Sequence, residues 1–279
     1  MDMSDRTRGK ELADELWRWY LTGEQTEASR LVGPYLRATR MLFSLLPGDP
    51  RCPNCSAPLS GVGAPVARIL GSSPSSFSPK LCGRCEQQVR KHEGGAQVEL
   101  SMLFADVRGS TALAGERAVS EYTALIKKFY RISSDILLRH DALVNRLMGD
   151  QVIGLFVPRL TGSKHARRAV EAAVEILQAT GHEESHGPWI QVGVGVHSGE
   201  AYVGSVGSGE SVTEIAVLGD NANKAARLSS NAAAGELIVS EEAKASAGLS
   251  GERMERRKLD LKGIAHPVEV WVMRSDQDL

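Results

Sequence analysis

The sequence predicts an α+β protein, in which a ferredoxin-like βαββαβ antiparallel sheet follows a helical segment and a small metal-stapled module. Two observations carry this prediction. After Val98, strand-like apolar runs alternate with amphipathic helical stretches in the order β-α-β-β-α-β. Before that point, all four cysteines of the chain stand in two C-x-x-C pairs. A chain of 279 residues is long enough for one large domain and one small one.

We expect three segments: a helical segment over residues 1–50, a four-cysteine module over 51–92 and the main domain over 98–274. Apolar side chains recur at helical steps in the first segment, until Pro47-Gly48-Asp49-Pro50 stops the helix. The second segment is rich in Gly, Pro and Ser. It could not bury a core alone and needs a metal as a staple.

The main domain is predicted element by element from its periodicity. The expected order is a strand over 98–105, a helix over 111–139, two strands within 141–157 joined by a turn at Gly149-Asp150, a helix over 164–180, and a strand over 190–197 with 200–206 as its hairpin partner. A helix over 221–230, a strand over 236–240 and a pair within 254–273 extend it. The two helices within the β-α-β-β-α-β unit, over 111–139 and 164–180, are expected on one face of the sheet.

Composition excludes several classes of protein. The formal charge of -1 and the pI near 6.7 argue against a protein that mainly grips nucleic acid. No apolar run approaches the roughly 20 residues of a membrane span. The N-terminus carries charges where a secretory signal would place its apolar core, so we expect a cytoplasmic protein without a membrane anchor.

Two aspartates follow strand ends. Asp106 ends the first strand and precedes a turn of small residues (Gly109, Ser110, Thr111) and a helix. Backbone amides at a helix start attract phosphate, and a carboxylate there holds Mg²⁺. Asp150 lies in the adjacent hairpin turn, so the two carboxylates could clamp two metals about 4 Å apart. The alternative is a helix-capping Asp106 and an ordinary turn residue at Asp150.

Four segments, LFADVRGST, NRLMGDQVIGLF, VGVGVHSGEAYVGSVG and VLGDNANKAARLSS, resemble in order and spacing the signature blocks of class III adenylate and guanylate cyclases. The similarity covers residues 98–273. It implies a ferredoxin-like catalytic domain that works as a head-to-tail homodimer, with active sites at the subunit interface. The implied reaction is attack of the ribose 3′-oxygen on the α-phosphorus of ATP or GTP, which gives a 3′,5′-cyclic nucleotide and pyrophosphate.

The resemblance also implies roles for individual residues. Asp106 and Asp150 match the two metal-binding aspartates, which hold two Mg²⁺ or Mn²⁺ ions, and the Val107 carbonyl adds a backbone ligand. Asn223 and Arg227 match the transition-state pair, of which the asparagine orients the ribose and the arginine meets charge developing at the α-phosphate.

The substrate-contacting positions depart from the family pattern. The lysine and the Asp or Thr that usually select adenine are replaced by Arg146 and Ala216. Arginine donates to adenine N1 but also suits the O6/N7 edge of guanine, and alanine accepts no hydrogen bond. Glu214 could substitute. We expect an adenylate cyclase; a guanylate cyclase, a base-promiscuous enzyme and a weakly active domain are the alternatives. Lys262 resembles the late lysine that contacts the triphosphate, or is simply a solvated strand-end lysine.

The cysteines predict a metal site. Cys52, Cys55, Cys82 and Cys85 form two knuckle-like pairs separated by 26 residues, which suits tetrahedral Zn²⁺ and resembles a zinc ribbon. An iron–sulfur cluster uses the same ligands, and unbound thiols are the third alternative. Few basic residues lie between the pairs, which favours protein contact over nucleic acid. We therefore expect a regulatory module that responds to a protein partner or to a redox or metal signal.

Overall fold

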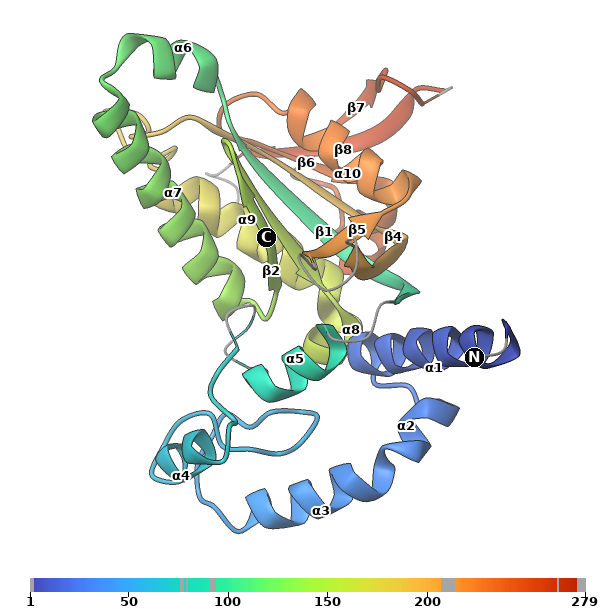
Figure 1. The fold of residues 1–279 in the computed structure, drawn as a ribbon. Coiled ribbons are helices and arrows are strands. Elements are labelled where there is room, and N and C mark those ends of the chain that lie inside the picture. The colour runs from blue at the N-terminus through green and yellow to red at the C-terminus, as the bar shows by residue number, and fades with distance from the viewer. Residues whose placement is uncertain are drawn as a thin grey trace. The chain divides into compact units, whose positions relative to one another are not determined.

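A computed structural model describes residues 3–75, 78, 80–90, 94–206, 214–264 and 266–274 (Figure 1). The chain divides into two compact units, which are treated separately below. The N-terminal unit comprises Met1–Val98, Pro158–Leu160 and Ala201–Leu218. The sheet unit comprises Glu99–Val157, Thr161–Glu200 and Gly219–Leu279.

The N-terminal unit begins with helices, as predicted. Its helices are α1 (Met3–Thr22), α2 (Glu27–Leu31), α3 (Gly33–Ser44), α4 (Ala64–Ile69) and α5 (Gly83–Arg90). Thr26 caps α2, because its hydroxyl accepts a hydrogen bond from the backbone N–H of Ser29 while the Ser29 hydroxyl accepts one from Thr26 N–H. Phe43 at the end of α3 packs with Leu59, Ala67 and the cysteines in a small apolar cluster.

The strands are β1 (Gly95–Val107), β2 (Leu143–Met148), β3 (Gln151–Phe156), β4 (Val192–Val206), β5 (Glu214–Leu218), β6 (Glu236–Ser240), β7 (Glu255–Leu259) and β8 (Val268–Arg274). Their order is β2-β3-β1-β4-β6-β8-β7, and β5 pairs with β4. The other helices are α6 (Ser110–Glu116), α7 (Val119–Arg139), α8 (Pro158–Thr161), α9 (His165–Ala179), α10 (Asp220–Asn231) and α11 (Glu241–Ala247). The order β1-α7-β2-β3-α9-β4 confirms the predicted ferredoxin-like α+β fold.

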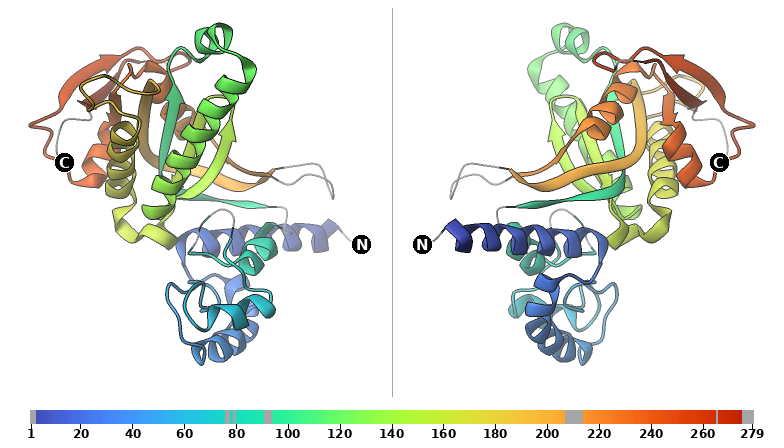
Figure 2. Two further views of the ribbon diagram at one scale, coloured as in Figure 1. Left: turned by 90° about the vertical axis from the view of Figure 1, so that its left-hand side faces the viewer. Right: turned by 90° about the vertical axis from the view of Figure 1, so that its right-hand side faces the viewer.

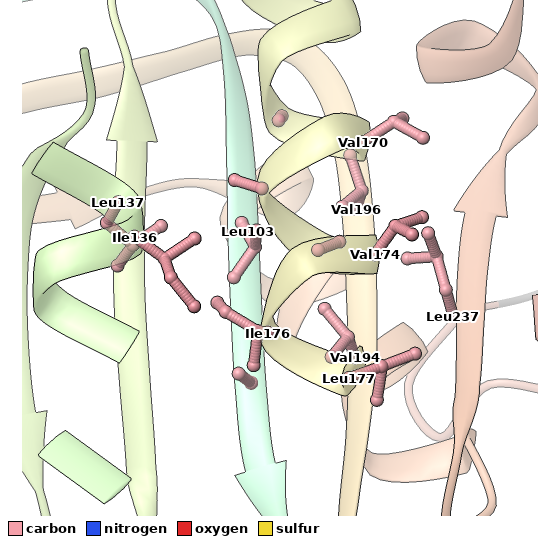
Figure 3. Close-up of a cluster of buried hydrophobic side chains, with 14 of the residues drawn as sticks. Leu103, Ile136, Leu137, Val170, Val174, Ile176, Leu177, Val194, Val196 and Leu237 are labelled. Carbon is pink, nitrogen blue, oxygen red and sulfur yellow. The ribbon is translucent and has the colours of Figure 1, made fainter. Parts of the chain in front are cut away.

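The main core lies between the sheet and helices α7 and α9. Figure 3 shows Val170, Val174 and Leu177 of α9 beside Val194 and Val196 of β4 and Leu237 of β6. All of these side chains are buried. The alternation of valines in β4 and the helical stripe of α9 are therefore two halves of one core, which fixes the register of the strands that carry the site.

The two helices of the βαββαβ unit, α7 and α9, pack on one face of the sheet as predicted, and the added helix α10 covers the other face. The two opposite views of Figure 2 bring α7 and α10 to the front in turn, on the two faces of the sheet. In β4 the valines face α9, whereas Gly193 and Gly195 face α10. A Cβ on Gly193 would lie 2.7 Å from the Ala232 carbonyl oxygen. Glycine is needed here because α10 rests directly on the strand backbone.

The predicted hairpin between 190–197 and 200–206 is wrong. These segments form one strand, β4, and the hairpin partner is β5, with Tyr202–Val206 opposite Glu214–Leu218. A tight hairpin needs residues with positive φ, and Gly199 has none. Gly199 instead gives room to Asn221, whose side chain would lie 2.8 Å from an added Cβ. The predicted helix over 111–139 is two helices, α6 and α7, separated by extended residues at Arg117 and Ala118.

None of the helices in the described part of the chain is both long and apolar enough to cross a bilayer.

Candidate active site

The structure brings Asp106 and Asp150 together in the sheet unit. Asp106 pairs with Gln151 in the register of β1 and β3, and the next residue, Val107, donates its N–H to the Asp150 carbonyl at 3.0 Å. Burial raises the pKa of Asp106; Arg108 opposes this shift and the Asp150 charge adds to it. Carboxylates at a strand end are hard oxygen ligands suited to Mg²⁺ or Mn²⁺, and the Val107 carbonyl is close enough in sequence to join them.

Both carboxylates have partners within the chain. The Arg108 guanidinium forms an ion pair with Asp106, and the Ser110 hydroxyl donates to Asp150. Arg108 also donates to the Ser230 carbonyl of α10 at 3.1 Å. Sequence reasoning gave Arg108 no role, although its place two residues after Asp106 in the same turn was a usable signal.

The turn after β1 has the conformation that the small residues predicted. Gly109 has φ 66°, a left-handed conformation that favours glycine, and α6 begins at Ser110, with Thr111 in its first turn. The turn that carries Asp150 is braced by the Tyr130 hydroxyl, which donates to the Gly149 carbonyl at 2.6 Å. The two turns that present the carboxylates are thus both held in place.

Asn223 and Arg227 lie on the exposed surface of α10. One helical turn separates them, so they share a face of the helix. Within the described residues, neither side chain forms a hydrogen bond or an ion pair. Among the described residues, no contact joins them to Asp106 or Asp150, and both side chains remain exposed.

The start of α10 is fixed by a buried network that sequence reasoning missed. Asn221 donates its Nδ2 to the Glu200 carbonyl at 2.8 Å, and its Oδ1 lies 2.9 Å from His197 Nε2. His197 is fully buried, with Nδ1 2.8 Å from the Ser240 hydroxyl. Burial lowers the pKa of His197, so the imidazole is held neutral. The network ties α10 to β4 and β6 and so positions the helix that carries Asn223.

The other predicted substrate contacts are more scattered. Arg146 pairs through its backbone with Ile153 of β3, and Ala216 of β5 lies opposite Gly204. The side chains of Arg146 and Glu214 lie outside the described residues. Ala216 belongs to the N-terminal unit, and Lys262 is exposed in the turn between β7 and β8.

Comparison with protein families gives a match over residues 95–275 to the adenylate and guanylate cyclase catalytic domain. The chain belongs to this family. It therefore carries a nucleotidyl cyclase catalytic domain, and this domain contains the paired aspartates and α10.

Relatives of the cyclase domain include an adenylate cyclase and a guanylate cyclase. The chain is 32% identical over 190 residues to the uncharacterized protein Rv1318c of Mycobacterium tuberculosis, covering 66% of this chain and 34% of that one. It is 28% identical to adenylate cyclase 1 of Rhizobium meliloti, covering 49% and 22%, and 27% identical to the receptor-type guanylate cyclase gcy-6 of Caenorhabditis elegans, covering 64% and 17%. The chain thus spans about a third or less of the length of these relatives.

Solved structures agree with the fold. The guanylyl cyclase Cya2 superposes with a TM-score of 0.58 at 25% identity, covering 64% of this chain and 92% of that one. The adenylyl cyclase CyaB from P. aeruginosa gives 0.58 at 24% identity, covering 66% and 98%. Cyclases of both base preferences therefore share this fold, and the fold alone does not select the base.

The cyclase chain also brings its four cysteines together, in the N-terminal unit. The sulfur atoms of Cys52, Cys55, Cys82 and Cys85 all lie within 4.8 Å of one another, with Cys55 and Cys82 3.5 Å apart. Sulfur atoms about 2.3 Å from a central Zn²⁺ have separations of this size. Hydrogen bonds from Cys55 and the neighbouring thiols lower the pKa of Cys52, which favours a thiolate. The donor set fits a tetrahedral metal ion.

Backbone hydrogen bonds shape both cysteine knuckles. In the first, the N–H of Cys52 donates to the Ala57 carbonyl at 2.9 Å and the N–H of Ser56 to the Cys52 carbonyl at 2.8 Å. In the second, the N–H of Cys85 lies 3.4 Å from the Cys82 sulfur, and α5 begins directly after Cys82. The knuckles therefore present their thiols from ordered turns.

Cys82→Ser is expected to lower the bound metal of purified protein from about one zinc ion per chain to a small fraction of that. Because a structural zinc site contributes folding free energy directly, we expect several kcal/mol of destabilisation of the N-terminal unit. Elemental analysis and thermal unfolding measure both effects, with Val66→Ser, an exposed change on α4, as the control. Wild-type protein without metal, or a Cys82→Ser variant that melts like the control, would contradict the assignment; visible absorbance would indicate iron–sulfur.

Proposed function

We propose that this cyclase is an adenylate cyclase, which converts ATP to 3′,5′-cyclic AMP and pyrophosphate at the interface of a head-to-tail homodimer. The observation that carries the proposal is the pair of carboxylates, Asp106 and Asp150, at neighbouring turns beside the start of α6. Oxygen ligands at this place suit a metal–polyphosphate complex. The alternative, a helix-capping Asp106 and an ordinary turn residue at Asp150, gives no reason for two carboxylates to stand at neighbouring turns.

In this proposal Asp106, Asp150 and the Val107 carbonyl hold two divalent cations. When bound, the cations would lower the pKa of the 3′-hydroxyl and neutralise phosphate charge. Asn223 holds the ribose so that its 3′-oxygen faces the α-phosphorus. The bond from that oxygen to phosphorus forms, the bond to the β-phosphate oxygen breaks, and the 3′-hydroxyl proton is lost to solvent. Arg227 donates to the oxygens of the α-phosphate, where negative charge develops.

The proposed homodimer is supported by the lack of contact between these two groups within one chain. Asp106 and Asp150 are joined by contacts within one chain, whereas Asn223 and Arg227 are exposed and have no such contact to them in the described residues. A second copy supplies α10 to the carboxylates of the first, so each active site takes residues from both chains. We also propose that residues 98–274 form the catalytic domain and that the cysteine module over 51–92, after the helices of 1–50, regulates it.

The preference for ATP over GTP tests whether the cyclase is an adenylate cyclase. Ala216 offers no acceptor to the adenine amino group, so ATP is expected to be favoured over GTP less strongly than in a cyclase with the usual pair. A buried hydrogen bond contributes about 1–3 kcal/mol of discrimination, or roughly 5- to 150-fold. Arg146→Lys with Ala216→Asp should raise the ratio of kcat/KM for ATP over GTP, and Arg146→Lys alone should do less.

The experiment measures both substrates with wild type, the single variant and the double variant, in the presence of Mn²⁺. A wild-type kcat/KM that is higher for ATP supports the adenylate cyclase. A higher value for GTP would make the protein a guanylate cyclase, which the guanine-compatible fork of Arg146 would then explain. An unchanged ratio in the double variant would place base selection at other residues, such as Glu214.

A further inference from the structure

A hollow lined by arginines lies in the N-terminal unit and takes no part in the reaction proposed above. Its volume is about 370 Å³, and its walls come from α1, the loop after it, α2 and α3. Small-molecule sites are typically concave, with volumes of about 300–1,000 Å³. The hollow is therefore large enough for one small organic molecule, and its lining indicates which kind.

The charge in the hollow is positive. Arg30, Arg37 and Arg40 all line it, and within the described residues none of the three forms an ion pair. Arg40 donates Nε to the Asn54 carbonyl at 2.9 Å and one Nη to the Pro53 carbonyl at 3.2 Å, which holds its side chain in place. Guanidinium groups bind phosphate and carboxylate through paired hydrogen bonds. Three of them around one hollow match an anion.

Part of the lining is apolar. Trp19 and Leu36 line the hollow and also line a smaller, mostly apolar hollow next to it, together with Leu16 and Val32. Trp19 is 7% exposed, so it presents only a limited surface. A ligand with both an anionic group and an apolar part therefore fits better than a bare ion. Its apolar part is removed from water when it contacts Trp19 and Leu36, while its charge pairs with the arginines.

The smaller hollow is lined by a buried donor, the side-chain amide of Asn54. Asn54 is 1% exposed, and among the described residues its Nδ2 has no hydrogen-bond partner. The orientation of the amide is fixed, because Arg159 donates to Asn54 Oδ1 at 3.0 Å. Buried donors are rarely left unpaired in proteins. An oxygen acceptor on a molecule that enters the hollow would satisfy Nδ2.

We propose that this hollow binds a small organic anion, with its phosphate or carboxylate group on Arg30, Arg37 and Arg40 and its apolar part against Trp19 and Leu36. The site is separate from the cyclase reaction. Cys85 lines only the smaller hollow, so a part of the ligand that extends into that hollow would approach a thiol of the cysteine cluster. A nucleic acid is a poorer match, since a hollow of this volume accepts one small group and a polyanion needs an extended basic surface.

Phenyl phosphate is the probe, titrated into the full chain by isothermal calorimetry without added divalent cation. We expect one equivalent to bind at least about fivefold more tightly than inorganic phosphate. Phenol and benzylammonium, which lack the anion, should give no heat at the same concentrations. Benzoate carries the alternative head group, and whichever of the two anions binds more tightly identifies the head. Binding of inorganic phosphate as tight as that of phenyl phosphate would overturn the proposal.

Variants locate the site. Arg30→Gln with Arg37→Gln should weaken phenyl phosphate binding about tenfold, since a partly exposed ion pair is worth up to about fivefold. Leu36→Trp should abolish binding by filling the hollow. Arg68→Gln, an exposed arginine of α4, is the matched control, and Arg227→Ala should leave binding unchanged because Arg227 belongs to the proposed nucleotide site and does not line this hollow. Unchanged affinity in the double variant, or in a Leu36→Trp protein that melts like wild type, would contradict the site.

Discussion

Replacing Asp106 or Asp150 by alanine is expected to lower cyclase activity by more than about 10³, with the fold intact. Each substitution removes a carboxylate ligand at the turns that carry the site, while the core residues of β1 and β3 are untouched. The loss should appear in kcat, because the interaction stabilises the transition state more than the bound substrate. Initial rates with ATP and Mn²⁺ measure it.

Asp135→Ala is the matched control, since Asp135 is an exposed aspartate of α7 outside the site.

The effect of the Asp106 charge on stability can be measured with Asp106→Asn. Burial raises the pKa of Asp106 despite the opposing charge of Arg108. Ionisation of this carboxyl therefore lowers the stability of the folded protein as the pH rises above the ordinary pKa of an aspartate. At pH 7 and without added divalent cation, Asp106→Asn should therefore melt at the wild-type temperature or above it. An Asp106 or Asp150 variant with more than about a tenth of wild-type activity would refute the metal assignment.

Mixing two inactive variants, Asp106→Ala and Arg227→Ala, is expected to restore activity. In a mixed dimer one interface combines Asp106 of one chain with Arg227 of the other and carries neither substitution. If subunits exchange freely, half of the dimers are mixed and one of their two sites is intact, which gives about a quarter of wild-type activity. Either variant alone should stay inactive at every concentration.

Subunit exchange must be measured in the same samples, for example with two fluorescent labels. No recovery after proven exchange would mean that each site is built within one chain. Arg131→Ala, which removes an exposed arginine of α7, is the control partner for Asp106→Ala. Every site in that mixture that draws its carboxylates from the Arg131→Ala chain is intact, so this mixture should be active from the start.

The fold could be predicted from the sequence where buried residues recur at the regular spacing of a strand or a helix. The valines of β4 and the stripe of α9 both arise from one core, and their alternation is written directly into the chain. The extension of β4 through Gly199 was not predictable in this way. A glycine in a strand pattern marks either a turn or a close approach, and only the position of Asn221 decides between them.

The candidate site shows the same division. Asp106 and Asp150 could be paired in advance, because hairpin topology places the β2–β3 turn beside the end of β1. The contact between His197 and Asn221 joins residues 24 positions apart through the packing of α10 on the sheet, which no local pattern reports. Arg108 reaches Ser230, 122 residues away, for the same reason.

The most direct test of the central claim is to identify the product of the purified chain given ATP, or GTP in parallel, with Mn²⁺. The cyclase site predicts a 3′,5′-cyclic mononucleotide and pyrophosphate in equal amounts, resolved by chromatography and ³¹P NMR, and neither product with Asp150→Ala. Release of inorganic phosphate with a nucleoside diphosphate, or the same products in the Asp150→Ala protein, would contradict the account.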